Sequence, residues 1–425
     1  MAREMKNSGL PWVGKIPSDW EIKRLKYAAD YFYKGNGITK DEVFEDGDIS
    51  CIRYGEIYSK YNGAFVNCIS KTKLMVQESP RHIKKGDILF ACTGELVEEI
   101  GKNIVYMGDN PCLVGGDIIV MRHQQDPIFM NYALNSYAQT QKSEGKAKLK
   151  VVHISSKDIQ NLMVLLPTLP EQKAIADFLD GKCAEIDGML ADLDAEVNNL
   201  AEYKKSIIAE MVTQGLNPDV PKKQSGIPWA ETIPAHWRIQ KGKYTFSLLK
   251  RPVKEDDGVI TCFRDGEVTL RSNRREDGFT MSAKEYGYQG IEPGDLVVHG
   301  MDGFAGSIGI SDSRGKGTPV LNVLDSDHNK RYLMYYLRNM AYGDVFLALS
   351  TGIRVRSCDL SWRKLGEIRI VLPPIEEQNA IATYLDEKCA VIDQTITDKH
   401  TQIETLKSYK ASLIYEYVTG KKQVI

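Results

Sequence analysis

The chain has 425 residues, of which 42% are hydrophobic and 26% are charged, and this length favours two or more folded domains. Its net charge of −2 excludes a protein that coats DNA through an overall positive field, so positive surface must be local or supplied by a partner. There is no apolar run of about 20 residues and no apolar signal stretch, so we expect a cytoplasmic protein without a membrane span. Eight scattered cysteines without a C-x-x-C pair favour reduced thiols.

The clearest feature is an internal duplication. The sequence Ser-Gly-Leu-Pro-Trp at residues 8–12 recurs as Ser-Gly-Ile-Pro-Trp at residues 225–229, which is 217 positions later. Residues 167–213 recur at residues 373–419, only 206 positions later. Because these blocks repeat closely while the inserts between them diverge, we interpret the chain as one scaffold that carries two different specificities. Plain duplication of a structural domain is the alternative.

Each insert shows the pattern of a mixed α+β domain. Strand-like runs bounded by Gly and Asp lie at residues 87–91, 118–121, 296–299 and 368–372, and helical stretches lie at 129–138 and 331–340. Long segments rich in helix formers follow Pro170 and Pro374, with Glu171, Glu376 and Glu377 near their positive ends. Trp12, Trp20, Trp229 and Trp237 are interpreted as packing anchors.

The two long segments carry apolar positions in alternating steps of three and four, the a/d pattern of a coiled coil. The register is identical over residues 176–211 and 382–417, and Lys399 breaks the apolar stripe of the second segment. The predicted seam consists of Leu179, Ile186, Leu193, Leu200, Ile207, Leu385, Ile392, Ile403, Leu406 and Leu413. A helix of about 43 residues is roughly 64 Å long, and such a seam cannot stay exposed to water. We expect antiparallel pairing within one molecule; an intermolecular coiled coil in a homodimer is the alternative.

The predicted fold is therefore α+β, with two mixed α/β domains joined by two long antiparallel helices in a pseudo-two-fold arrangement. The predicted boundaries are residues 1–166 for the N-terminal segment and first domain, 167–216 for the first helical spacer, 217–372 for the second domain and 373–425 for the second spacer. Catalytic signatures are missing from the sequence. It contains no G-x-x-x-x-G-K-[ST] loop, no G-x-G-x-x-G motif that follows a strand, and no N-P-P-Y-type tetrapeptide.

Two repeated motifs resemble those of a known family. An I-P-x-x-W motif ends at Trp20 and again at Trp237, before each insert. A second motif follows each insert: Leu-Pro, then Glu-Gln, then Leu-Asp at residues 166–180 and again at 372–386. Over essentially the whole chain, these motifs resemble the specificity subunit of type I restriction–modification systems.

The resemblance implies a non-catalytic subunit with two target recognition domains, each reading one half of a bipartite site in double-stranded DNA. The helices would set the gap between the half-sites and dock two modification (methyltransferase) subunits. Restriction subunits, which translocate and cleave DNA, would join that complex. No cofactor is expected in this chain, and S-adenosylmethionine and ATP with Mg²⁺ are expected on the partner subunits. No metal site is expected either.

Candidate DNA-contacting residues are basic or aromatic side chains at strand ends and loops. They are Arg53, Tyr54, Lys60, Lys146, Lys148, Lys150, Arg264, Arg271, Arg274, Arg275, Arg354 and Arg356. Lys142 belongs to the same basic run as Lys146. Two alternatives stand beside this interpretation: the basic loops are simply solvated, and Arg53 and Arg264 pair internally with Glu56 and Glu267.

Two other functions compete with DNA recognition. One is a coiled-coil scaffold that binds only protein, which predicts no sequence-dependent affinity for DNA. The other is a self-contained methyltransferase or nuclease, against which the missing motifs count. The target sequence and the gap length cannot be read from the chain, because these domains follow no simple base code.

Overall fold

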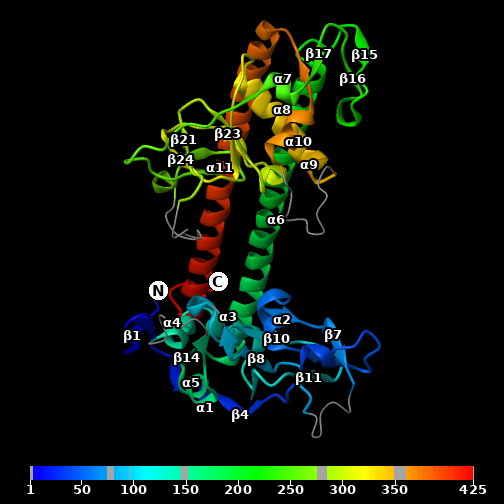
Figure 1. Ribbon diagram of the computed structural model, residues 1–425. Helices are drawn as coiled ribbons and strands as arrows, with labels where there is room; N and C mark the ends of the chain where they lie inside the picture. The colour runs from blue at the N-terminus through cyan, green and yellow to red at the C-terminus, as the bar shows by residue number, and fades with distance from the viewer. Residues whose placement is uncertain are drawn as a thin grey trace. The chain divides into compact units, whose positions relative to one another are not determined.

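The computed structural model describes residues 3–73, 81–94, 96–144, 152–274, 285–348 and 360–424. The chain divides into two compact units (Figure 1). The first unit contains Met1–Leu193 and Gln402–Ile425, and the second contains Asp194–Thr401, so each unit includes part of both long helices. Among the described residues, none of the helices combines the length and apolarity that a membrane span requires.

The first unit is built on a five-stranded sheet with the order β4-β12-β8-β10-β6. The strands are β4 (Ala29–Lys34), β12 (Ile118–His123), β8 (Ile88–Ala91), β10 (Asn103–Tyr106) and β6 (Ala64–Phe65). Alternate residues of β8 belong to two different cores, as the two-residue period of a strand requires. Phe90 packs with Phe129 of helix α3 (Pro127–Asn135), whereas Leu89 joins a core that includes Val114 of a second, three-stranded sheet.

That second sheet has the order β11-β5-β7, with β11 (Cys112–Val114), β5 (Ile49–Ile52) and β7 (Ser70–Thr72). Three short strand pairs complete the first unit: β1 (Met5–Asn7) with β2 (Lys15–Pro17), β3 (Glu21–Arg24) with β14 (Met163–Leu166), and β9 (Thr93–Gly94) with β13 (Val152–His153). The other short helices among the described residues of this unit are α1 (Leu25–Ala28), η1 (Lys40–Glu42), α2 (Tyr54–Ser59), η3 (Val97–Glu99), α4 (Ala138–Ser143) and α5 (Ser156–Asn161).

The second unit repeats this plan with a four-stranded antiparallel sheet in the order β18-β25-β22-β23. Its strands are β18 (Ser247–Leu248), β25 (Leu321–Asp325), β22 (Leu296–His299) and β23 (Ile308–Ile310). Helix α8 (Lys330–Tyr342) packs against this sheet through buried residues such as Leu333 and Leu337.

Smaller elements surround this sheet. Four strand pairs are β15 (Lys222–Gln224) with β16 (Thr232–Pro234), β17 (Arg238–Lys241) with β26 (Arg369–Leu372), β19 (Ile260–Cys262) with β20 (Val268–Leu270), and β21 (Gln289–Ile291) with β24 (Gly315–Gly317). The short helices are η4 (Pro228–Ala230), α7 (Gly242–Thr245), η5 (Arg271–Asn273), η6 (Gly303–Ala305), α9 (Val345–Ala348) and α10 (Trp362–Glu367).

The long helices α6 (Leu169–Gln214) and α11 (Ile375–Val418) pair antiparallel within one chain, as predicted. In the first unit, Lys410 bonds Asp187 at 2.6 Å, and the rings of Phe178 and Tyr417 lie 4.5 Å apart. In the second unit, Lys204 bonds Asp393 at 2.6 Å, and Lys399, which interrupts the apolar stripe, bonds Glu196 at 2.5 Å.

The predicted seam residues are sheltered along these helices. Seven of them are buried: Leu179, Ile186, Ile207, Leu385, Ile392, Ile403 and Leu413. Leu193, Leu200 and Leu406 are partly exposed.

The repeated motifs make equivalent contacts in the two units. The indole nitrogen of the buried Trp20 donates to Glu171 at 3.2 Å, and that of Trp237 donates to Glu377 at 3.1 Å. The Glu-Gln motif therefore does more than supply negative charge to a helix N-terminus, because its glutamate fixes the tryptophan of the preceding motif.

The glutamine of the motif is buried, and its side-chain amide bridges two segments of the chain. We call Gln172 and Gln378 the bracket glutamines. The Gln172 side chain accepts from the backbone nitrogen of Asp126 at 2.9 Å and donates to the carbonyl oxygen of Pro167 at 2.9 Å. Gln378 repeats both bonds with Asn329 at 3.0 Å and Pro373 at 2.8 Å. In each unit this one side chain ties the N-cap of α3 or α8 to the start of a long helix.

Most predicted elements are present, with small differences at their ends. The helix predicted over residues 129–138 ends at Asn135, whose side-chain amide donates to the Asn103 carbonyl at 2.7 Å and accepts from the Asn103 nitrogen at 3.0 Å. Pro170 lies within the first turn of α6 rather than ahead of it, a position that tolerates proline because its missing N–H would be unpaired there. The seven cysteines among the described residues carry free thiols.

Candidate nucleic-acid interface

The second unit contains an open cleft of about 810 Å³ next to the hairpin β19–β20. Its lining includes three of the predicted arginines; it consists of Thr261, Cys262, Phe263, Arg264, Asp265, Arg271, Arg274, His299, Asp302 and Ser307. These residues come from the hairpin, from η5 and the residue after it, and from the stretch between His299 at the end of β22 and Ser307. The structure thus brings together residues that lie up to 46 positions apart in the sequence.

An Asp-Gly turn shapes the hairpin beside the cleft. Gly266 has φ +88°, and its backbone nitrogen donates to the Phe263 carbonyl at 3.0 Å. The Asp265 carboxylate accepts from the Glu267 nitrogen at 3.1 Å. A residue with a side chain would be strained at this positive φ, and its Cβ would also displace the guanidinium of Arg338, so the turn favours glycine. The turn therefore sets the direction in which Arg264 leaves the hairpin.

The three arginines of the cleft differ in how they are held. Arg274 bonds Asp265 at 2.6 Å and Glu267 at 3.0 Å, and its guanidinium lies 4.3 Å from the centre of the Phe263 ring. Arg271 donates through Nε to the Thr261 hydroxyl at 3.0 Å. The side chain of Arg264 is 66% exposed and bonds Asp302 at 2.9 Å. Arg264 is the most exposed cation of the three.

The floor of the cleft is polar and partly buried. His299 Nδ1 accepts from the backbone nitrogens of Met301 and Asp302, at 3.2 and 2.9 Å. Burial lowers the pKa of His299, which favours the neutral ring; because Nδ1 accepts, the proton lies on Nε2. The hydroxyl of Ser307 is buried and has no hydrogen-bond partner in the described part of the chain. Both groups are potential donors to a ligand in the cleft.

The corresponding arginine of the first unit has a different environment. Arg53 lies at the N-cap of α2, its side chain is 29% exposed, and it approaches Glu56 at 3.5 Å. Glu56 also accepts from the Arg53 backbone nitrogen at 2.9 Å and from the Ser70 hydroxyl. Tyr54 is 40% exposed, and Lys60, at the other end of α2, is exposed as well. Of these three predicted residues, the arginine is the one held inward.

The internal pairing considered for the two arginines holds in one half and fails in the other. Arg53 contacts Glu56 as that alternative supposes. Arg264 pairs with Asp302 instead of Glu267, because Glu267 lies against Arg274. The expected partner was wrong because residues separated by three positions face each other on a helix such as α2 but not across a tight hairpin turn.

Lys142 was counted in the basic run before α6, and the structure contradicts that placement. It lies in the last turn of α4 and is buried, with its amine donating to the Gly101 carbonyl at 2.7 Å and to the Asn103 side chain at 3.0 Å. Burial lowers its pKa to about 7. Six other predicted residues lie outside the described residues: Lys146, Lys148, Lys150, Arg275, Arg354 and Arg356.

Sequence reasoning missed a basic and aromatic surface in the first unit. A cavity of about 360 Å³ is lined by Tyr31, Phe32, Tyr33, Arg81, His82 and Arg122. Arg122 lies over the Tyr31 ring at 5.2 Å and is anchored to Asp87 by a 2.8 Å hydrogen bond. The run of three aromatic residues in β4 was the available signal. His299 and Asp302 of the second cleft were also missed, since they carry no motif.

Comparison with known proteins agrees with the motifs. Residues 17–189 match the family model described as type I restriction modification DNA specificity domain. A putative type I restriction enzyme MjaX specificity subunit from Methanocaldococcus jannaschii is 25% identical over 97% of this chain and 96% of its own length. The EcoBI specificity subunit from Escherichia coli is 28% identical over 73% of this chain and 69% of its own. The chain is thus similar over nearly its whole length to type I restriction enzyme specificity subunits, and residues 17–189 match their DNA specificity domain.

A solved structure shares the fold of this chain. A chain from a type I R-M system, determined in work on complex assembly and conformational transition, has a TM-score of 0.70 at 15% identity. The match covers 96% of the present chain and 99% of the other. The family model covers the first unit's insert, and the repeated Trp–Glu and Gln contacts extend the same architecture to the second.

Proposed function

We propose that this chain is the DNA-reading subunit of a type I restriction–modification complex and carries out no catalysis itself. Each insert reads one half of a bipartite target in double-stranded DNA, and α6 and α11 set the gap and dock two modification subunits. Restriction subunits complete the assembly. The methyl donor S-adenosylmethionine, and ATP with Mg²⁺, are bound by those partners. The complex acts in the cytoplasm, where scattered thiols stay reduced.

The observation that carries this proposal is a contrast between two parts of each half. The frame, which consists of the repeated motifs and the long helices, is the same in both halves, whereas the insert between the motifs differs. The bracket contacts of Gln172 and Gln378 are the same in both units, whereas Arg53 is held inward and Arg264 projects into a cleft. A scaffold that binds only protein has no need for two different inserts on one repeated frame. Two readers of different base sequences need such an arrangement, because base edges must be matched by different side chains.

The decisive test is methylome sequencing of a host that lacks other adenine methyltransferases and expresses this chain with its modification subunits. We expect methylated adenines in two half-sites separated by a fixed gap. We also expect the purified complex to bind that site with an affinity that falls steeply with salt, because phosphate contacts release counterions. Expression of the modification subunits alone is the control. Methylation that does not depend on this chain would contradict the proposal.

A second experiment tests the role of the helices. Residues 193–199 of α6 lie opposite 398–404 of α11, as the ion pair between Glu196 and Lys399 indicates. Deletion of both segments removes both partners of that ion pair, so neither charge is left unpaired. The deletion shortens each helix by about 10 Å. We expect unchanged half-sites with a gap shorter by about three base pairs, given the 3.4 Å rise of B-DNA. An unchanged gap would show that the helices do not set it.

A further inference from the structure

Arg264 and Asp302 form an exposed acid–base pair at the cleft of the second unit. Their side chains are joined at 2.9 Å and are 66% and 37% exposed. The other two arginines of the cleft are engaged, Arg274 by two carboxylates and a ring, and Arg271 by Thr261. Arg264 is therefore the most exposed donor of the three arginines, and it is joined to one carboxylate, whereas Arg274 is held by two carboxylates and a ring.

The backbone on both sides of this pair is fixed. Arg264 follows Phe263, whose backbone nitrogen bonds the Glu267 carbonyl at 2.8 Å across the Asp-Gly turn. Asp302 is held by the 2.9 Å bond from its nitrogen to His299 Nδ1, and its carbonyl accepts from the Ala305 nitrogen at 2.9 Å. A donor and an acceptor set on two rigid turns are positioned before any ligand arrives, which lowers the entropy cost of binding.

We infer that Arg264 and Asp302 together read one G·C base pair in the half-site recognised by the second unit. The guanidinium of Arg264 donates to O6 and N7 of the guanine, and the carboxylate of Asp302 accepts from the N4 amino group of the paired cytosine. In the major groove only a G·C pair presents two adjacent acceptors beside this amino donor. This inference rests on the proposed function and names the base pair that one of its sites reads.

The same cleft is poorly suited to a phosphate. Asp265 and Asp302 both line it, and carboxylates repel a phosphate group. The lining also includes Arg271 and Arg274, which are already engaged, and two neutral donors, His299 Nε2–H and the Ser307 hydroxyl. A base edge carries no net charge and tolerates these carboxylates. Phosphate contact by Arg264 is therefore the alternative outcome of the test.

The test uses the full complex of this chain with its modification subunits and a library of duplexes in which both half-sites are randomised. Methylation of the library gives the base preference at every position of the wild-type target. For Arg264→Ala we expect loss of the guanine preference at a single position in one half-site, with roughly tenfold to hundredfold lower discrimination there. The other half-site and the gap are expected to stay unchanged.

Two further variants test the same inference in case Arg264→Ala folds poorly. Arg264→Lys retains the charge but loses the planar pair of donors, so we expect a weakened guanine preference. Asp302→Asn replaces an acceptor by an amide, which suits adenine, so we expect a changed preference at the same position. Arg331→Ala is the matched control, because Arg331 pairs with Asp386 with side chains 51% and 33% exposed but lies away from the cleft.

Three results would overturn the inference while leaving the proposed function intact. The first is a wild-type target with no G·C pair in the second half-site. The second is an Arg264→Ala complex that methylates with unchanged base preference. The third is uniform weakening at all sequences with a shallower dependence on salt, which would identify a phosphate contact. If the wild-type complex shows no sequence preference, the proposed function itself fails.

Discussion

The two halves of the chain agree in their frame and differ in their inserts. In both, a buried tryptophan is held by a glutamate, a glutamine brackets a helix N-cap, and a lysine on one long helix bonds an aspartate on the other. The inserts differ at equivalent places: Arg53 lies against Glu56, while Arg264 projects beside Asp302. Residues that position the helices therefore repeat, and residues at the candidate DNA surfaces do not.

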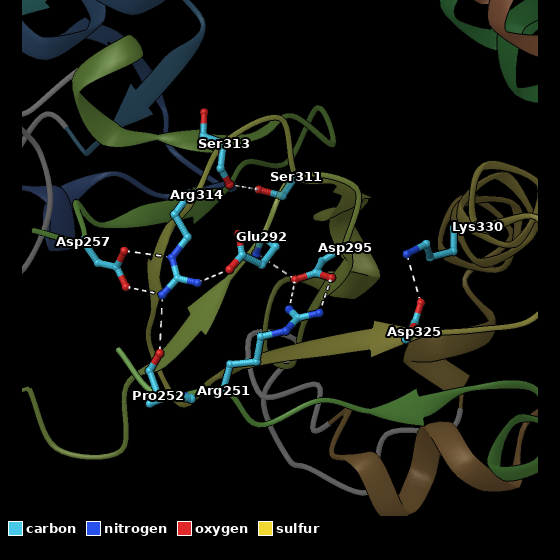
Figure 2. Close-up of polar contacts among 10 residues, drawn as sticks. All are labelled: Arg251, Pro252, Asp257, Glu292, Asp295, Ser311, Ser313, Arg314, Asp325 and Lys330. Atoms are coloured by element: carbon cyan, nitrogen blue, oxygen red, sulfur yellow. Dashed lines mark hydrogen bonds and ion pairs between the residues drawn. The ribbon is translucent and has the colours of Figure 1, made fainter. Parts of the chain in front are cut away.

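A polar network in the second unit joins segments of its insert through ion pairs that differ from those of the first unit. Arg314 bonds Asp257 at 2.8 Å and also contacts Glu292, while Arg251 contacts Asp295 (Figure 2). The Arg314 guanidinium lowers the pKa of Asp257 to about 2, so that carboxylate stays charged at neutral pH. These pairs tie the segment before β19 to the turn between β21 and β22. In the first unit, Asp87 instead bonds Arg122 of β12.

The largest effects are expected in the shared frame. Leu179 and Leu385 are fully buried at equivalent seam positions, so Leu179→Ala and Leu385→Ala should each lower the free energy of unfolding by about 2–5 kcal/mol. Hydrogen exchange should locate the loss in the first unit for Leu179 and in the second for Leu385. Val391→Ala, at a side chain that is 66% exposed, is the control. Very unequal losses would show that the frame is not equivalent in the two halves.

The bracket glutamines should give the next largest effect. Gln172→Ala and Gln378→Ala each leave a backbone N–H and a carbonyl without their partner, at a cost of about 1–3 kcal/mol in unfolding free energy. Urea unfolding of the matched variants measures this cost. Gln394→Ala, on the exposed face of α11, should change stability by less than about 0.5 kcal/mol. A bracket variant as stable as this control would refute the role given to the motif.

A pH-dependent contribution to stability above about pH 7 is expected from Lys142 in the first half. The pKa of Lys142 is about 7 in the folded chain, against about 10.4 for an unburied lysine. Between these values the unfolded chain binds more protons, so stability rises with pH, by up to about 1.4 kcal/mol per pH unit. Below the folded pKa both states hold the proton and the dependence disappears.

The Lys142 term is measured as the difference in unfolding free energy between the wild type and Lys142→Met from about pH 6 to pH 9. We expect the wild type to gain stability relative to the variant across this range. In the second unit the short helix after α8 buries Phe346 instead, so Phe346→Leu should show no comparable slope. A constant difference between the wild type and Lys142→Met would show that Lys142 does not change its charge here.

The smallest effects should come from the ion pairs across the helices. Lys204–Asp393 and Lys410–Asp187 have carboxylates that are about half exposed, so each pair should contribute less than about 1 kcal/mol. A double-mutant cycle on each pair measures its coupling energy, and high salt should reduce it. Coupling well above that value in one pair alone would reveal a difference between the halves that the geometry does not show.

Much of the frame could be predicted from the sequence, because periodicity and repetition are local signals. The heptad pattern placed α6 and α11 to within a few residues, and the repeated motifs identified equivalent segments. The candidate surfaces were harder. Arg264, Arg271 and Arg274 were predicted one by one, but the cleft that unites them with His299 and Asp302 depends on β22 lying beside the hairpin. No spacing pattern in the sequence predicts that these residues lie close together.

The sequence by itself determined the duplication, the heptad register and the positions where frame gives way to insert, because each is a pattern along the chain. Only the tertiary structure decided which charged side chains face solvent. Lys142 belongs to a basic run yet is buried, and Arg53 and Arg264 occupy equivalent places yet differ in exposure. The reason is physical: the cost of burying a charge depends on partners brought from distant segments, such as Gly101 and Asn103 for Lys142.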